Sequence, residues 1–178
     1  YTINSMGKHN DNEFDLCATT HCQVYKGLNA EVQSTNKAID DTKGKLILYN
    51  GKPASVFYFA SSGGWTENSE NVWSAALPYL KGVEDKYELT ASSHYYWENT
   101  FTPAQVGSLL LSKGIDIGNV LGINVKKYTE AGRVLELEIV GSKKSYTLTK
   151  QATRMTFGLN SQMYKVFSGS GISVKSGS

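Results

Sequence analysis

Short blocks of hydrophobic and polar residues alternate along the first half of the chain and predict helices followed by a hairpin. The pattern predicts the end of a helix at residues 3–9, and a second helix from Asn29 as N-cap to about Thr42, with Gly44 after its last turn. The inward face of this second helix would consist of Val32, Ala38 and Ile39.

The strongest local signal is a predicted β-hairpin. Apolar runs at residues 46–49 and 55–60 flank the dipeptide Asn50-Gly51, which is typical of a two-residue hairpin turn. The second run leads directly into a Ser-Ser-Gly-Gly sequence at residues 61–64. A short helical turn is expected near residues 68–76, and a polar connection at residues 88–94.

The second half predicts a helix followed by antiparallel strands. Thr102, Pro103 and Gln105 have the spacing of a capping box with proline at the first helical position, and Gly114 ends the predicted helix. The elements expected next are strands at residues 121–129, 134–140 and 145–149, a helix at 150–157, and a closing strand at 162–167. The last stretch, 168–178, is of low complexity.

These elements predict an α+β fold class, because helices and antiparallel hairpins alternate without βαβ crossovers. We expect a core lobe and a smaller β-rich lobe. The whole chain, residues 1–178, is interpreted as one domain with tentative lobes at 1–90 and 91–178.

Composition and charge exclude several classes of protein. With 40% hydrophobic and 19% charged residues in a chain of 178, a folded core is expected. The net charge of +2, with lysines spread thinly, argues against nucleic-acid binding.

No apolar run approaches the roughly 20 residues of a membrane-spanning helix, so a membrane link is expected only through a segment absent from this sequence. The sequence does not begin with Met, so we expect that an upstream segment has been removed. Its many Ser, Thr, Asn and Tyr residues favour an extracytoplasmic, cell-wall-facing location.

One segment concentrates metal-ligating side chains. Cys17, His21 and Cys22 lie within six consecutive residues, and two thiolates with one imidazole provide three ligands for a tetrahedral zinc ion. Spacing alone leaves two alternatives, a small disulfide loop or two free thiols, and the disulfide excludes the metal. His9 and His94 are interpreted as surface histidines, of which either is a candidate fourth ligand.

The cysteine-containing segment is the first of four sequence motifs that together resemble a known family. The motifs occur in the order FDLCATTHCQVYKG at 14–27, AIDDTKG at 38–44, ASSGGWTE at 60–67, and VW at 72–73 leading to PYLKGV at 78–83. This order resembles the family of sporulation stage II protein D and the amidase enhancer LytB. The resemblance extends from Phe14 to Asp85, about 40% of the chain.

The resemblance implies a peptidoglycan lytic transglycosylase. Such an enzyme cleaves glycan strands between N-acetylmuramic acid and N-acetylglucosamine, leaves 1,6-anhydro products during cell-wall remodelling in sporulation, and works with a partner amidase. The resemblance also implies one zinc ion on Cys17, His21 and Cys22, with a structural or cleft-shaping role. Two alternatives from other classes are a non-catalytic glycan-binding or amidase-activating module, and a secreted adhesion domain with a disulfide loop.

The catalytic carboxyl is not identified in this sequence. In the family, one Glu serves as both acid and base, and its motif lies upstream of the position of Tyr1, so the catalytic residue stays unassigned. Glu67 and Glu70 are interpreted as capping or solvated carboxylates.

Substrate contacts are expected near the cysteines and in the Ser-Ser-Gly-Gly segment. Glycine permits close approach of a sugar to the backbone, and neighbouring aromatic rings can stack on pyranose rings. The expected substrate-binding residues are Gln23, Tyr25, Ser61, Ser62, Gly63, Gly64 and Thr66. Trp65, Trp73 and Tyr79 are the candidate stacking residues.

Overall fold

The computed structural model describes residues 1–88, 96–168 and 172–175. The chain forms two compact units, Tyr1–Tyr58 and Phe59–Ser178, which we describe separately. The lobe boundary expected near residue 90 stays a prediction. Most of the connection expected at 88–94 lies outside the described residues.

The first unit consists of short elements. They are α1 (Thr2–Ser5), two 3₁₀ turns (Asn10–Asn12 and Leu28–Ala30), α2 (Gln33–Asp41), β1 (Leu48–Tyr49) and β2 (Lys52–Pro53). The hairpin around Asn50-Gly51 is confirmed, because Asn50 and Gly51 adopt φ values of 50° and 76°, as a two-residue turn of this type requires. The strand predicted at residues 55–60 is wrong, since β2 ends at Pro53 and the pairing continues with one bond, from the Ala54 N–H to the Ile47 carbonyl at 2.9 Å.

Helix α2 differs from its prediction at its start and on its inward face. It begins at Gln33 rather than after Asn29, which lies in the second 3₁₀ turn. The predicted inward face is wrong, because Val32 and Ile39 are 57% and 61% exposed and α2 contains no buried residue. A unit of this size encloses little volume, and its buried hydrophobic residues are Cys22 and Ala54.

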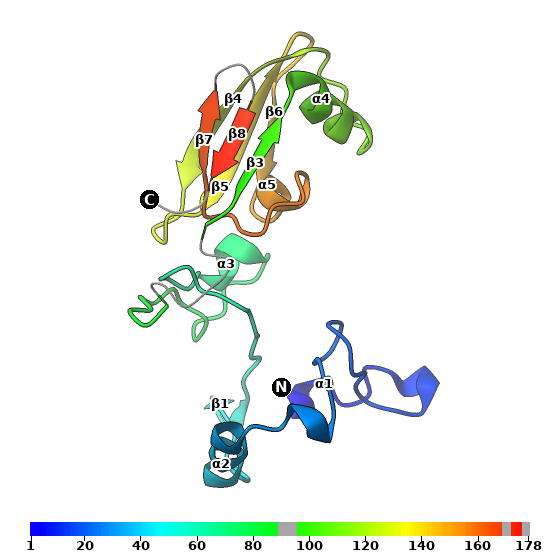
Figure 1. The fold of residues 1–178 in the computed structure, drawn as a ribbon, viewed down its shortest axis with the longest axis vertical. Coiled ribbons are helices and arrows are strands. Elements are labelled where there is room, and N and C mark those ends of the chain that lie inside the picture. The colour runs from blue at the N-terminus through cyan, green and yellow to red at the C-terminus, as the bar shows by residue number, and fades with distance from the viewer. Residues whose placement is uncertain (89–95, 169–171, 176–178) are drawn as a thin grey trace. The chain divides into compact units, whose positions relative to one another are not determined.

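The second unit contains most of the regular structure. Its elements are α3 (Ser69–Val72), β3 (Glu98–Phe101), α4 (Pro103–Leu111), β4 (Val120–Tyr128), β5 (Val134–Gly141), β6 (Tyr146–Thr149), α5 (Ala152–Met155), β7 (Lys165–Ser168) and β8 (Ile172–Lys175). The strand orders are β4-β5-β6 in one sheet and β3-β8-β7 in the other, with antiparallel neighbours. The two sheets lie face to face (Figure 1). The α+β fold class is therefore confirmed.

Local signals located the helix and the meander in this unit correctly. The Thr102 hydroxyl accepts from the Gln105 backbone, and the Gln105 side chain accepts from the Thr102 N–H, which confirms the capping box at the start of α4. Strands β4, β5 and β6 confirm the predicted meander. The low-complexity ending contains β8, which pairs with β3 and β7. Neither β3 nor β8 was predicted, because their pairing depends on residues far apart in the sequence.

The hydrophobic core lies in this β-rich unit, whereas we expected the N-terminal half to form the core lobe. Its buried members are Val106, Leu110, Ile117, Val134, Leu137, Ile139, Leu148, Leu159 and Tyr164. Alternation along β5 buries Leu137 and Ile139 in the core, and Val134 joins them at the start of the strand, where the pairing with β4 shifts its register. Within the described residues, no helix has the length and apolarity needed to cross a bilayer.

Candidate functional site

A cluster of four metal-ligating side chains lies in the first unit. His9 directly precedes the first 3₁₀ turn, and the other three members, Cys17, His21 and Cys22, belong to one irregular loop. Within this loop the Cys22 N–H donates to the Thr19 carbonyl at 3.2 Å. The tight turn brings residues that are neighbours in sequence to one point in space.

Distances between the ligand atoms are short. His9 Nε2 lies 3.2 Å from Cys22 Sγ, and His21 Nδ1 lies 3.5 Å from Cys22 Sγ and 3.8 Å from Cys17 Sγ. All four ligand atoms lie within 4.8 Å of one another. Both cysteines are free thiols in this structure.

This donor set fits a tetrahedral zinc ion. Zinc bonds of about 2.3 Å to sulfur and 2.0–2.1 Å to nitrogen separate tetrahedral ligands by roughly 3.3–3.8 Å. The nitrogen–sulfur distances of 3.2, 3.5 and 3.8 Å in the cluster are close to this range. Two thiolates and two imidazoles are also ligands that zinc prefers.

Hydrogen bonding makes Cys17 an acidic thiol. The Thr19 hydroxyl lies 3.2 Å from its sulfur. Bonds with Thr19, first through its hydroxyl and then through its backbone, together with a bond to His21, lower the pKa of Cys17 to about 5. A thiolate is the form that binds a metal.

Neighbouring groups hold the cluster in place. The Tyr1 hydroxyl donates to the Cys22 carbonyl at 2.8 Å, and Lys8 Nζ donates to the His21 carbonyl at 3.0 Å. The ring of Phe14 lies 5.0 Å from that of His9. His9 is half-buried and belongs to the cluster rather than to the open surface that we expected. His94 lies outside the described residues.

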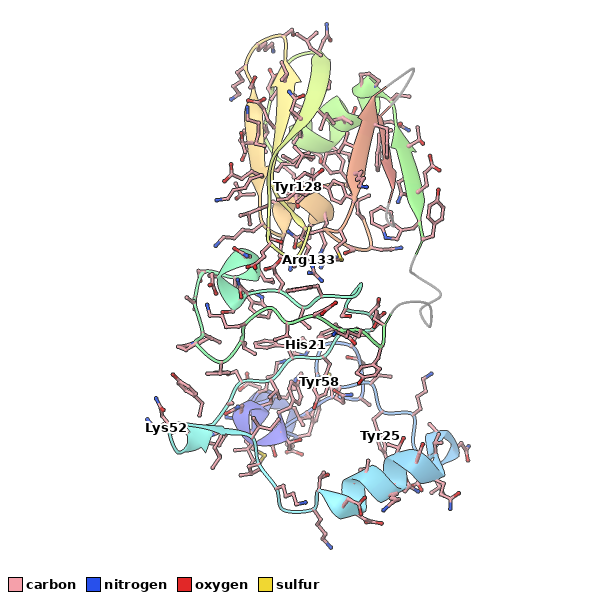
Figure 2. The ribbon with its side chains drawn as sticks, turned by 90° about the vertical axis from the view of Figure 1, so that its left-hand side faces the viewer. His21, Tyr25, Lys52, Tyr58, Tyr128 and Arg133 are labelled. Atoms are coloured by element: carbon pink, nitrogen blue, oxygen red, sulfur yellow. The ribbon has the colours of Figure 1, made fainter. Side chains whose placement is uncertain are left out.

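The two substrate residues expected beside the cluster are both exposed. Gln23 and Tyr25 follow Cys22 on irregular backbone, and the Tyr25 N–H donates to the Ala18 carbonyl at 3.2 Å. Figure 2 labels His21 and Tyr25 on this part of the chain. Their contact with a glycan stays a prediction.

The other predicted substrate residues lie in the second unit, on a loop at residues 61–66. Ser61 donates a short hydrogen bond to Glu88, and Ser62 donates to Asp85 at 2.9 Å. The Asp85 N–H in turn donates to the Gly64 carbonyl at 2.9 Å. Ser62 is only 2% exposed, so any glycan contact through its hydroxyl requires exchange of its bond with Asp85.

Both glycines of this loop require a conformation that other residues rarely adopt. Gly63 and Gly64 have φ values of 68° and 91°. Gly63 is exposed, and Thr66 pairs with the backbone of Val83 through bonds of 2.9 and 2.8 Å. The loop therefore presents Gly63 to solvent while Thr66 anchors its far end.

The two glutamates close to the loop have structural partners. Glu67 accepts from the Asn68 N–H and the Asn71 side chain, both at 2.8 Å, at the start of α3. Glu70 forms an ion pair with Lys81 at 2.6 Å, and this bond lowers the pKa of Glu70. Glu70, whose side chain is 35% exposed, agrees with its interpretation as a solvated carboxylate, whereas Glu67 is buried beside Arg133.

Three residues of this site were missed by sequence reasoning. Asp85 and Glu88 hold the two serines, and Arg133 binds the loop backbone from the turn before β5. Burial lowers the pKa of Arg133, while the charge of Glu67 opposes this effect. The available signal was its rarity, since Arg133 and Arg154 are the only arginines in the chain.

Comparisons with known families divide the chain into two matched regions. Residues 1–49 match the family described as Stage II sporulation protein, and residues 80–170 match a family described as a domain of unknown function (DUF8618). The first match contains the whole His/Cys cluster. The loop at residues 61–66 lies between the two matches.

Three relatives illustrate the similarity. The chain is 40% identical over 88 residues to the Amidase enhancer of Bacillus subtilis (strain 168), covering 49% of this chain and 12% of that protein. It is 29% identical over 131 residues to Stage II sporulation protein D of the same organism, covering 74% and 36%. It is 35% identical over 71 residues to Stage II sporulation protein D of Bacillus amyloliquefaciens, covering 40% and 20%. The chain thus spans about a third or less of these relatives.

Proposed function

The chain belongs to the family of stage II sporulation protein D and the amidase enhancer LytB, and on that premise we propose that it forms part of a peptidoglycan lytic transglycosylase. The family supports a sporulation-related role at the cell wall. The proposal adds the reaction, cleavage between N-acetylmuramic acid and N-acetylglucosamine to 1,6-anhydro products, and a location on the wall-facing side of the membrane. The observation that carries it is the family match through the His/Cys cluster.

The proposed reaction needs one carboxyl group that first donates a proton and then accepts one. It must protonate the glycosidic oxygen and then take the proton from the C6 hydroxyl of the muramic sugar. Glu67 is unsuited to this task, because its side chain is only 8% exposed and its oxygens already accept from two N–H donors and the Thr129 hydroxyl. We assign the acid to none of the described carboxyls, because the glutamate that the family uses has no counterpart identified in this sequence.

The reaction is tested by digesting purified, peptide-stripped peptidoglycan. The chain and a version extended at its N-terminus by the gene's own sequence are compared, and mass spectrometry detects 1,6-anhydro-muramic ends. Anhydro products from either version support the proposal, and products from the extended version alone assign the acid to the added segment. Hydrolytic ends, or no cleavage by either version, would contradict it.

We further propose that the cluster binds one zinc ion through His9, Cys17, His21 and Cys22. The two thiols, the two imidazoles and their short separations support this ligand set. With four protein ligands the site is closed, which is typical of structural zinc rather than of zinc that activates water. The ion would fix the loop that leads into Gln23 and Tyr25.

Elemental analysis with histidine variants tests the ligand set. We expect one zinc per chain in the wild type, and a loss of zinc in H9A and H21A. H94A is the matched control, because His94 is the chain's remaining histidine and is not part of the proposed set. Zinc retention in H9A together with loss in H94A would replace His9 by His94, and no zinc in the wild type would refute the site.

A second candidate function is activation of a partner amidase through glycan binding without cleavage. The specific observation in its favour is the 40% identity to the Amidase enhancer of Bacillus subtilis. This candidate is preferred if the extended chain sediments with peptidoglycan and raises the rate of a cell-wall amidase, yet yields no anhydro products.

A further inference from the structure

The guanidinium of Arg133 binds the backbone of the loop at residues 61–66. Its Nη2 donates to the carbonyls of Ser62 and Trp65, both at 2.8 Å, and Nη1 donates to the Thr66 carbonyl at 3.4 Å. Three carbonyls of one short loop thus converge on one side chain. Such a set of contacts fixes the orientation of the peptide planes around the two glycines.

Arg133 is itself held in one position. Its side chain is 14% exposed, and that of Glu67, whose carboxylate lies 3.9 Å away, is 8% exposed. The Thr129 hydroxyl connects the two residues, since it donates to Glu67 at 2.6 Å and accepts from the Arg133 N–H at 3.1 Å. A buried guanidinium with these partners has little freedom to move.

The backbone of Arg133 belongs to a rigid turn of the β-rich unit. The Thr129 N–H donates to the Arg133 carbonyl at 2.8 Å, and the Val134 N–H donates to the Gln162 carbonyl at 2.9 Å. Figure 2 shows Arg133 at the end of the meander, close to Tyr128 at the end of β4. The turn therefore fixes the backbone of Arg133, and the Arg133 side chain binds the loop from this fixed position.

A second contact from the same unit reaches the loop at Gly63. A Cβ at this position would lie only 2.5 Å from Met163 Sδ. Met163 thus occupies the space that any larger residue at 63 would need. Arg133 thus binds the loop at its carbonyls, and the Met163 side chain lies beside Gly63.

We infer that Arg133 is a positioning residue for the loop at residues 61–66. The part of the chain that matches a domain of unknown function serves as the scaffold that holds this loop in its glycan-binding conformation. The inference rests on the proposed peptidoglycan function and on the glycan contacts that the sequence predicts for that loop. It assigns a task to residues 80–170, which contain Arg133, Thr129 and Met163. Arg133 acts through the loop backbone and not by touching the sugar.

Lysine cannot take over this task. The planar guanidinium offers several N–H donors in a fixed fork, whereas an ammonium group is a single point on a flexible stem. R133K therefore keeps the charge beside Glu67 but loses the simultaneous bonds to Ser62 and Trp65. If the charge alone mattered, R133K would restore function.

The test compares R133M and R133K with R154M, which alters the chain's second arginine. Arg154 binds Gln151 and Leu159 of its own segment and none of the loop. Sedimentation with peptide-stripped peptidoglycan is measured at a temperature where circular dichroism shows every variant to be folded. We expect roughly tenfold weaker binding for both Arg133 variants, as small misplacements of a binding group are costly, and wild-type binding for R154M. Folded Arg133 variants that bind like the wild type would overturn the inference, and if R133M does not fold, R133K decides.

Hydrogen exchange by NMR separates this inference from the proposed function. The amides of Thr66 and Asp85 are bonded within or next to the loop. We expect them to exchange faster in R133K than in R154M, even if the wild type does not bind peptidoglycan. Absence of wild-type binding would refute the glycan-binding role alone, whereas unchanged exchange in R133K would refute the positioning role.

Discussion

At the scale of single residues, the chemistry of the His/Cys cluster depends on the neighbours of its thiols. Cys17 has a pKa of about 5, mainly because Thr19 binds its sulfur. This value lies below that of an unfolded thiol, so the thiolate's contribution to stability is complete above the unfolded pKa and is lost as the pH falls through about 5. The thiolate needed for metal binding is therefore present at neutral pH.

Alkylation of the metal-free protein tests this acidity. We expect the rate of Cys17 modification by iodoacetamide to rise with pH around a midpoint near 5. T19V should shift the midpoint upward, because it removes the largest cause of the lowered pKa, and T19S should retain it. Mass spectrometry of the modified peptide gives the rates, and an identical midpoint in T19V and T19S would contradict the role of Thr19.

The pair Glu67 and Arg133 offers a second prediction at this scale. E67Q leaves the buried guanidinium without its counter-charge, which typically costs about 3 kcal/mol. Urea unfolding measures the loss. E70Q is the control, because the Glu70–Lys81 pair is far more exposed, and a loss in E67Q no larger than that in E70Q would show that the buried pair is unimportant.

At the scale of elements, the start of α4 depends on its capping box. Thr102 and Gln105 each satisfy a backbone N–H of the other residue. T102A should reduce the free energy of unfolding by about 1 kcal/mol, as for other lost N-caps. T102S keeps the hydroxyl and should stay close to the wild type; equal unfolding midpoints for the alanine and serine variants would contradict the cap.

Adjacent leucines on α4 distinguish core packing from helix formation. Leu110 is fully buried in the core, and Leu111 is exposed. L110A should destabilise the protein by roughly 3 kcal/mol, because it leaves a cavity, whereas L111A should change stability by about 0.5 kcal/mol or less. Chemical unfolding of both variants provides the comparison. Similar losses in the free energy of unfolding would contradict the packing of α4 through Leu110.

At the scale of the whole molecule, the two units differ in what stabilises them. The β-rich unit has a hydrophobic core, whereas the first unit buries Cys22 and Ala54 and leaves its helix α2 exposed. Bound zinc would supply order that apolar burial does not.

Hydrogen exchange with and without zinc tests this difference. We expect zinc to slow exchange around Cys17 and Cys22, and to leave the amides of β4 and β5 unchanged, since their protection comes from the core. Chelation should reverse the effect. If zinc slowed exchange equally around the cysteines and in β4 and β5, a local stabilising role for the metal would be contradicted.

The sequence by itself determined the features that depend on neighbouring residues. The Asn50-Gly51 turn, the capping box at Thr102 and the meander of β4, β5 and β6 were predictable, because turn chemistry, capping and alternation act over a few positions. The proximity of Cys17, His21 and Cys22 was equally local. The ordered motifs resemble the same family whose model matches residues 1–49.

The tertiary structure decided what depends on distant contacts. It brought His9 to Cys22, paired the low-complexity ending with β3 through β8, and placed Arg133 on the carbonyls of the loop at residues 61–66. It also left α2 without a buried face. Pairing, burial and carbonyl recognition join residues far apart in sequence, and no local pattern encodes which distant partner each of them meets.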